Sequence, residues 1–208
     1  MNSGRRIVTF THVSVDGYFS TPDGGLSWVI QDAELDRSIA ATIERAAAES
    51  GDDTILFGRR TYEQFEAFWP HALSDSPTSP DPHHAGRSSP EMRAMAVMLN
   101  EATKLVFSRT RKAVTWQRSR LLHDIDPSEI AAMKREPGKD IMIFGSGTIV
   151  SQLTRHGLID EYQFIVSPQL LGSGRQLIGG VPTSLKLNLV EATAFPSGNV
   201  RLRYTRPN

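Results

Sequence analysis

The sequence predicts a three-layer α/β fold, in which a mainly parallel sheet is covered by helices on both faces and ends in an antiparallel hairpin. As far as residue 157, short apolar segments alternate with segments whose apolar residues recur at helical spacing. After residue 160 the pattern changes to the two-residue alternation of strands, with a turn at 196–199. Alternating strands and helices favour a parallel sheet, and the final alternating segments favour an antiparallel edge.

Composition and charge are those of a soluble globular chain. Of the 208 residues, 39% are hydrophobic and 22% are charged, which fits one domain spanning 1–208. Lys plus Arg and Asp plus Glu both number 23, so no net charge attracts nucleic acid or a membrane surface. The sequence has no cysteine, which excludes disulfides and thiolate metal sites. Because no signal-peptide core or long apolar run is present, we expect a cytoplasmic protein.

The first half of the chain contains strand, helix, strand and helix in that order. Apolar and β-branched residues predict a buried strand at 6–15 and another at 54–57. Leu35, Ile39 and Ile43 predict a helix that stops by Gly51, and a second helix should begin near Thr61. The segment 71–90 is rich in Ser, Pro, Asp and His, which predicts a mobile loop insertion.

The second half contains three further helices and the remaining strands. Ser89 and Asp126 have the identity of helix caps, and each is followed by proline. The helices that they introduce should be followed by one that begins after 145–147 and ends at Gly157. The expected strands, identified by apolar or alternating residues, are 104–107, 113–116, 140–144, 162–166, 185–189 and 200–204.

Three predicted strands are followed by loops of similar character. These loops contain Gly58-Arg59-Arg60-Thr61, Ser108-Arg109-Thr110-Arg111 and Gly145-Ser146-Gly147-Thr148. Parallel strands end at one edge of the sheet, and two of the loops lead into helix starts, whose N–H groups favour an anion. A single Gly-x-Gly is more often a tight turn, and neither the dinucleotide fingerprint nor the Walker motif is present. Together, however, the three loops indicate a ligand with several phosphates.

Six motifs taken together resemble the dihydrofolate reductase-like superfamily. The nearest branch is the C-terminal reductase domain of the bifunctional riboflavin biosynthesis deaminase/reductase, as a stand-alone relative. The motifs occur in family order and are SVDGYFS at 14–20, FGRRTYEQF at 57–65, KLVFSRT at 104–110, IMIFGSGTIVSQL at 141–153, GLIDE at 157–161 and SPQLLGSG at 167–174.

The resemblance implies an NADPH-dependent oxidoreductase that transfers a hydride to a small heterocyclic or ribosyl-bearing substrate. An example is 5-amino-6-(5-phosphoribosylamino)uracil in riboflavin biosynthesis, and relatives of this branch are typically homodimers. Dihydrofolate reductases commonly have Gly-Gly-Gly-Arg where this chain has Gly-Ser-Gly-Thr at 145–148, so neither a cis peptide at 145–146 nor that arginine contact carries over. The residues that the resemblance implies in cofactor binding are Gly58, Arg59, Arg60, Thr61, Ser108, Arg109, Gly145, Ser146, Gly147, Thr148 and Ile149.

The substrate side has less specific candidates, and several have a structural alternative. The resemblance implies Asp16 and Asp32 as catalytic acids, and the implied substrate-binding residues are Gly17, Trp28, Leu171 and Gly172. Asp16-Gly17 is also the signature of a simple turn, and Asp32 precedes a helix as an N-cap would. Trp28 is equally compatible with a plug in the core.

Two other classes of function remain open on the sequence. One is a noncatalytic, dimeric NADP(H)-binding protein, and the other is a true dihydrofolate reductase. We expect no metal site, because His83-His84 have no third ligand at useful spacing. Met92, Met95 and Met98 indicate either helix packing or a dimer contact.

Overall fold

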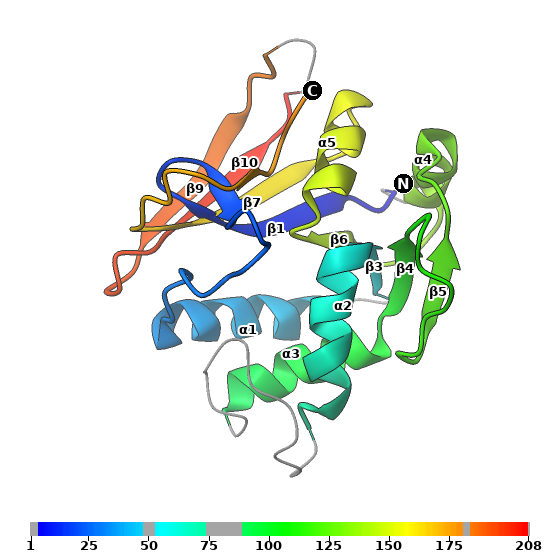
Figure 1. Cartoon of the computed structure of the whole chain (residues 1–208), viewed down its shortest axis with the longest axis horizontal. Coiled ribbons are helices and arrows are strands. Elements are labelled where there is room, and N and C mark those ends of the chain that lie inside the picture. Colours follow the sequence, from blue (N-terminus) through cyan, green and yellow to red (C-terminus); the bar gives the residue numbers. More distant parts are fainter. Residues whose placement is uncertain (1–3, 48–52, 74–88, 181–183, 208) are drawn as a thin grey trace.

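The computed structural model describes residues 4–47, 53–73, 89–180 and 184–207. Its main feature is an eight-stranded sheet in the order β5-β4-β3-β6-β1-β7-β10-β9, with helices on both faces (Figure 1). The three-layer α/β fold expected from the alternating segments is therefore confirmed. Most of the predicted loop at 71–90 lies outside the described residues.

The pairing of the strands divides the sheet into a parallel part and an antiparallel part. From β5 to β7 all neighbours run parallel, whereas β10 pairs antiparallel with both β7 and β9. A separate two-stranded sheet joins β2 to β8. The strands are β1 Ile7–Ser14, β2 Tyr18–Ser20, β3 Thr54–Gly58, β4 Thr103–Phe107, β5 Ser119–Leu122, β6 Ile141–Phe144, β7 Glu161–Ser167, β8 Arg175–Gln176, β9 Asn188–Ala194 and β10 Val200–Thr205.

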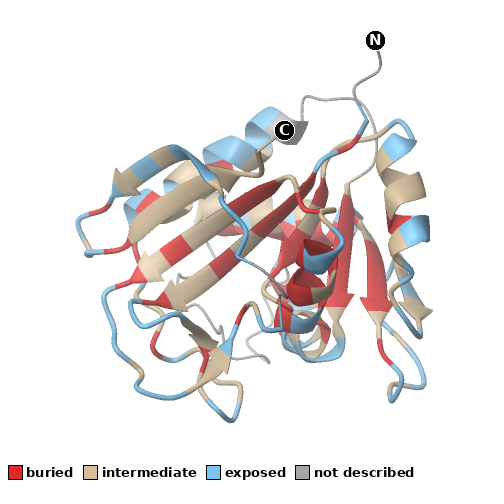
Figure 2. Ribbon diagram, turned by 90° about the horizontal axis from the view of Figure 1, so that it is seen from above, coloured by how far each residue is buried: buried red, intermediate tan, exposed pale blue. Residues whose placement is uncertain are grey.

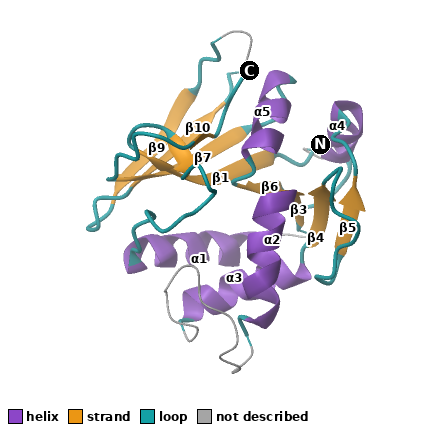
Figure 3. Ribbon diagram, in the orientation of Figure 1, coloured by secondary structure: helices purple, strands orange, loops and turns teal. Residues whose placement is uncertain are grey.

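The helices form the two outer layers (Figure 3). They are α1 Ala33–Ala47, α2 Arg59–Phe68, α3 Pro90–Glu101, α4 Pro127–Arg135 and α5 Gly147–Arg155, with a short 3-10 helix at Trp69–His71. Side chains alternate across a strand, so β3 serves both layers. Ile55 and Phe57 pack with α2 and α3, whereas Leu56 packs with α4 and α5.

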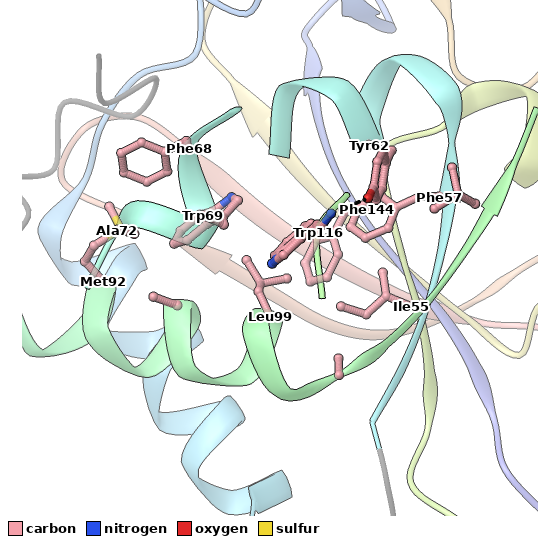
Figure 4. Close-up of a cluster of buried hydrophobic side chains, with 13 residues drawn as sticks. Ile55, Phe57, Tyr62, Phe68, Trp69, Ala72, Met92, Leu99, Trp116 and Phe144 are labelled. Carbon is pink, nitrogen blue, oxygen red and sulfur yellow. Dashed lines mark hydrogen bonds between the residues drawn. The ribbon is translucent and has the colours of Figure 1, made fainter. Parts of the chain in front are cut away.

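The core beneath α2 and α3 is rich in aromatic rings (Figure 4). Tyr62 of α2 lies edge-on to Phe57 of β3, with ring centroids 5.9 Å apart. Trp116 is buried beside both rings, and its indole N–H donates to Asn100 of α3 at 2.7 Å. These contacts fix α2, and with it the junction of β3 and α2 at Gly58, against the sheet.

Trp116 also explains why the strand predicted at 113–116 is wrong. The backbone N–H groups of Thr115 and Trp116 donate to Glu66 and Tyr62 instead of to a neighbouring strand. The edge strand of this part of the sheet is β5, a few residues further along the chain. The apolar residues of 113–116 predict a strand, but in the structure they fill the core from a segment without regular secondary structure.

The helix starts follow the predicted caps, but some boundaries differ. The Ser89 side chain accepts from the N–H of Met92, and the Asp126 side chain accepts from the N–H of Ser128, so both cap predictions are confirmed. Helix α2 begins at Arg59, directly after β3, rather than near Thr61. The strand expected at 185–189 is β9, which begins only at Asn188.

Burial is highest in the inner strands of the sheet (Figure 2). Residues 54–57 of β3 are all buried, whereas β9 at the sheet end has no fully buried residue among Asn188–Ala194. The inner parallel strands thus form a rigid base, and their carboxyl ends carry the predicted phosphate loops.

Candidate functional site

The carboxyl ends of β4, β3, β6 and β1 are neighbours at one edge of the sheet, and a cleft of about 1540 Å³ lies over them. Ligands of open α/β sheets bind at this edge. The cleft is lined by every residue that the sequence assigned to the cofactor: Gly58, Arg59, Arg60, Thr61, Ser108, Arg109, Gly145, Ser146, Gly147, Thr148 and Ile149. Three loops that are far apart in the sequence therefore form one surface.

Ser146 holds two of these loops together. Its hydroxyl accepts from the N–H of Gly58 at 2.9 Å and donates to the hydroxyl of Thr61 at 3.1 Å. The backbone of Ser146 is left-handed, with φ 57° and ψ 60°, which turns the chain sharply from β6 into α5. The N–H of Gly145 donates to the carbonyl of Phe10 at 3.1 Å, so the same turn is also fixed to β1.

The two helices that begin at this edge have no side-chain cap. Gly58 precedes α2 and Ser146 precedes α5, and neither forms a side-chain hydrogen bond to its helix. The first N–H groups of a helix have no partner within the helix, and they carry a partial positive charge. Both helix starts line the cleft, so their N–H groups are suited to bind an anion there.

Three arginines add positive charge to the same part of the cleft. Arg59 pairs with Glu63 at 3.4 Å, and Arg109 pairs with Asp124 at 2.6 Å. The Arg109 side chain is 79% exposed, so its ion pair is weak and can exchange for a phosphate. Arg60 is exposed and lines the cleft as well.

Arg111, which follows the same strand as Arg109, has a structural role instead. Its guanidinium pairs with Glu66 and stacks over the Tyr62 ring, 4.9 Å from the ring centroid. It does not appear among the described residues that line the cleft. Ser108 shapes this loop, because its hydroxyl accepts from the N–H groups of Thr110 and Arg111.

Asp16 lies at the end of β1 and is used to fix a loop. Its carboxylate accepts from the Ser14 hydroxyl at 2.6 Å and from the N–H groups of Leu171 at 3.1 Å and Gly172 at 2.7 Å. The hydrogen bond from Ser14 and those from the backbone lower the pKa of Asp16. Gly17, at φ +86°, turns the chain back, and its N–H donates to the Ser14 carbonyl.

The structure therefore joins four of the predicted substrate-side residues to one another, but not to the cleft. Asp16, Gly17, Leu171 and Gly172 are all absent from the described residues of the cleft wall. Their geometry is that of the turn which the Asp-Gly sequence also allowed. Trp28 is likewise a core residue here: it is 9% exposed and does not line the cleft in the described part of the chain.

Asp32 does line the cleft, and it caps α1. One carboxylate oxygen accepts from the N–H groups of Glu34 and Leu35, and the other accepts from the N–H of Ser197. Burial alone would raise the pKa of Asp32, but the hydrogen bonds from Ser197, Leu35 and Glu34 outweigh it and lower the pKa. A carboxylate held in its ionised form by these bonds is a poor proton donor.

Several residues of the cleft wall were missed by the sequence analysis. Phe10, Thr11 and His12 of β1 and Ser20 of β2 all line it. The Thr11 and Ser20 side chains are nearly fully buried, and their hydroxyls have no hydrogen-bond partner among the described residues. The sequence feature that could have identified the β1 residues is the presence of the polar residues Thr11 and His12 in a segment otherwise typical of a buried strand.

The described residues contain no group of three or more His, Cys, Asp or Glu side chains that could hold a metal ion. His83-His84 lie outside them. None of the described helices is long and apolar enough to cross a membrane.

Comparison with known proteins places this chain in a family. The chain is 27% identical to the uncharacterized protein YyaP of Bacillus subtilis over 96% of this chain and 94% of that protein. A putative riboflavin biosynthesis protein from Shewanella sp. PV-4 has a similar structure, with a TM-score of 0.66, 21% identity and coverage of 98% and 99% of the two chains. Dihydrofolate reductase from Enterococcus faecalis, solved with NADP(H), has a TM-score of 0.59, 13% identity and coverage of 98% and 97%.

The two solved structures confirm the dihydrofolate reductase-like fold expected from the six motifs. The model of the RibD C-terminal domain family matches residues 5–201, which is nearly the whole chain. The protein therefore belongs to the RibD C-terminal domain family, whose members are reductase-like.

Proposed function

We propose that this protein is a cytoplasmic, NADPH-dependent reductase that transfers a hydride to a small heterocyclic or ribosyl-bearing substrate, as 5-amino-6-(5-phosphoribosylamino)uracil reductases do. The observation that supports it is the convergence of three loops, two uncapped helix starts and Arg59, Arg60 and Arg109 on one cleft. NADPH has a pyrophosphate and a 2'-phosphate, and backbone N–H groups and arginines are the donors that phosphates prefer.

The residues present fit such a cofactor. Gly145 has φ +53°, and a Cβ at this position would meet only the Thr61 hydroxyl, at 3.8 Å, so the backbone stays open to a close ligand. The bound cofactor would supply the hydride. Loop 145–149 would orient its nicotinamide end, and the arginines would hold its adenosine end.

The size of the cleft favours an enzyme over a noncatalytic NADP(H)-binding protein. Small-molecule pockets are typically about 300–1,000 Å³, and this cleft of about 1540 Å³ continues past the phosphate loops to β1 and α1. The cleft therefore has room for a second molecule beside the cofactor, and holding the two in contact is what favours hydride transfer. A true dihydrofolate reductase is less well supported, because the Asp32 carboxylate already accepts three backbone hydrogen bonds.

The test is cofactor preference. We expect the wild-type protein to bind NADPH more tightly than NADH, and the Arg59→Ala/Arg109→Ala variant to lose about tenfold in NADPH affinity with little change for NADH. The figure is modest because both side chains are exposed and already paired. Titration by cofactor fluorescence measures both constants.

Arg120→Ala/Arg135→Ala is the matched control, since both arginines are exposed and neither lines the cleft. It should leave both affinities unchanged. Equal affinity of the wild type for the two cofactors, or an equal loss of both in the cleft variant, would contradict the assignment of these arginines to the 2'-phosphate.

A further inference from the structure

The cleft has a second part, which differs in character from the phosphate loops. It extends between β1, α1, α2 and α3, and its wall is formed largely by Phe10, Leu35, Ile39, Phe65, Met95 and Phe144. Phe144 lies 6.1 Å from Phe10 and 5.7 Å from Phe65, measured between ring centroids. Ile39 and Phe10 also pack together around buried Leu35. We call this part the apolar compartment.

Most apolar side chains of the compartment are half buried, so they line the open cleft and do not belong to a sealed core. Phe10, Ile39, Phe65 and Met95 all have intermediate exposure, although each packs against a core cluster. Each therefore presents part of its surface to the cleft. Removing that surface from water favours binding of an apolar molecule.

The ionisable side chains that β1, α1 and α3 and their caps present to the described cleft are three carboxylates and the imidazole of His12, whose ring centroid lies 5.9 Å from that of Phe10. Among the described cleft residues, the carboxylates on α1 and α3 are Asp36 and Glu91, and Asp32 caps α1 beside them. The arginines of the described wall lie toward the phosphate loops and on β8, although Arg59 and Arg60 begin α2, whose later residue Phe65 lines the compartment. Arg59, Arg60 and Arg109 follow β3 and β4, and Arg175 of β8 donates to the carbonyl of Pro22 at 2.9 Å.

A substrate with a phosphate or carboxylate does not suit this compartment. An anion buried without a cation loses its hydration and gains nothing in return. Here it would also be repelled by Asp32, Asp36 and Glu91, as like charges are at short range. The cations that could offset these costs lie at the end of the cleft that the cofactor would occupy.

We propose that, within the heterocyclic class of the proposed function, the substrate of this reductase is a neutral, mainly apolar ring compound with a reducible C=O or C=N bond and no phosphate or carboxylate. The protein then shares the type of reaction of 5-amino-6-(5-phosphoribosylamino)uracil reductases but not their phosphorylated substrate. This inference rests on the proposed function for the hydride donor. In the reaction, NADPH transfers a hydride to the carbon of the double bond, and the oxygen or nitrogen takes a proton. The products are the CH–OH or CH–NH compound and NADP⁺.

The experiment compares two probes that differ only in the phosphate, 1-naphthol and 1-naphthyl phosphate, by calorimetric titration of the whole chain with and without NADPH. With NADPH bound, so that the phosphate loops are occupied, we expect naphthol to bind at least tenfold more tightly than the phosphate. Equal or tighter binding of the phosphate in the presence of NADPH would overturn the substrate class, and so would failure of naphthol to bind at millimolar concentration.

Matched variants identify the compartment as the binding place. Glu91→Gln removes a negative charge from the first turn of α3 and should raise the affinity for naphthyl phosphate several-fold without changing that for naphthol. Glu129→Gln makes the same change in the first turn of α4, outside the described cleft wall, and should alter neither. Identical behaviour of the two variants would contradict the proposed compartment.

The two proposals fail in different ways. Absence of NADPH binding would overturn the proposed function, whatever the naphthol result. Normal NADPH binding together with a preference for the phosphate probe would overturn only the inference about the substrate.

Discussion

At the scale of single residues, Ser146 connects two of the loops at the phosphate end of the cleft. Its left-handed backbone is a conformation that costs a non-glycine residue about 1 kcal/mol, and its hydroxyl connects the start of α2 to the start of α5. Ser146 keeps this unfavourable conformation at the point where its hydroxyl joins the two helix starts. We therefore expect Ser146 to order the two loops for the cofactor.

Replacing Ser146 tests this role. Ser146→Ala and Ser146→Gly both remove the hydroxyl, and both should weaken NADPH binding about fivefold, the equivalent of one hydrogen bond of ~1 kcal/mol. Only Ser146→Gly relieves the positive φ, so it should retain more thermal stability than Ser146→Ala. Cofactor titration and a thermal melt measure the two effects separately.

Ser151 provides the control within the same helix. Its buried hydroxyl donates to the Leu177 carbonyl at 3.1 Å and accepts from the N–H of Gly179 at 3.0 Å, and it does not line the described cleft. Ser151→Ala should lower the melting temperature and leave NADPH affinity unchanged. If both Ser146 variants bind NADPH as tightly as the wild type, the ordering role is wrong.

At the scale of elements, a row of alternating charges ties the antiparallel part of the sheet together. Glu161 of β7 is 2% exposed and accepts from Arg203 of β10 at 2.9 Å and from Arg6 at 3.2 Å. Arg203 continues the row to Glu191 of β9 at 2.9 Å, and Glu191 also pairs with Arg201 at 2.6 Å. Removing one partner would leave a buried charge uncompensated.

This row predicts how stability depends on acid pH. Hydrogen bonds from Arg201, Thr193 and Arg203 lower the pKa of Glu191 from 4.5 to about 2. The native state therefore favours the ionised form, and the stabilisation is complete above about pH 4.5 and lost as the pH falls toward about 2. We expect the melting temperature to fall across this window.

Glu191→Gln should be less stable than the wild type at neutral pH and should show a shallower fall in acid. Glu44→Gln on α1 makes the same change at an exposed position and should follow the wild-type curve. Parallel acid curves for Glu191→Gln and the wild type, recorded by thermal melts, would show that Glu191 contributes nothing to the pH dependence.

The elements also show what the sequence could predict. Caps such as Ser89 and Asp126 depend on residues three positions apart or fewer, so the sequence located those helix starts correctly. The apolar residues of segment 113–116 predict a strand. Its backbone N–H groups donate instead to side chains of α2, which are distant in the sequence, so the sequence alone could not show this.

The same distinction holds at the scale of the whole molecule. The phosphate end of the cleft could be predicted, because each loop has its own local Gly and Arg signature and parallel strands bring the loops together. The apolar compartment could not, because Phe10, Ile39, Met95 and Phe144 come from four separate elements and each resembles an ordinary core residue. The contacts of Asp16 and Asp32 could not be predicted either, because their partners Leu171, Gly172 and Ser197 are distant in the sequence.

The outer end of the sheet is where we expect the molecule to associate. Strand β9 is the last strand, so one of its edges lacks a neighbouring strand in the described sheet. Leu189 and Val190 of this strand are 58% and 51% exposed. An unpaired, apolar edge favours association with another chain. By contrast, Met92, Met95 and Met98 of α3 pack against the core, which leaves the sheet edge as the better candidate for the interface.

We therefore expect a homodimer in which β9 edges face each other across a two-fold axis. Light scattering at micromolar concentration should give twice the mass of the chain, and Leu189→Asp/Val190→Asp should give the monomer, because charge on an edge strand opposes pairing. Val97→Asp is the control, since Val97 is 43% exposed on α3 and should leave the dimer intact. A wild-type monomer would refute the dimer, and dissociation by Val97→Asp alone would move the interface to α3.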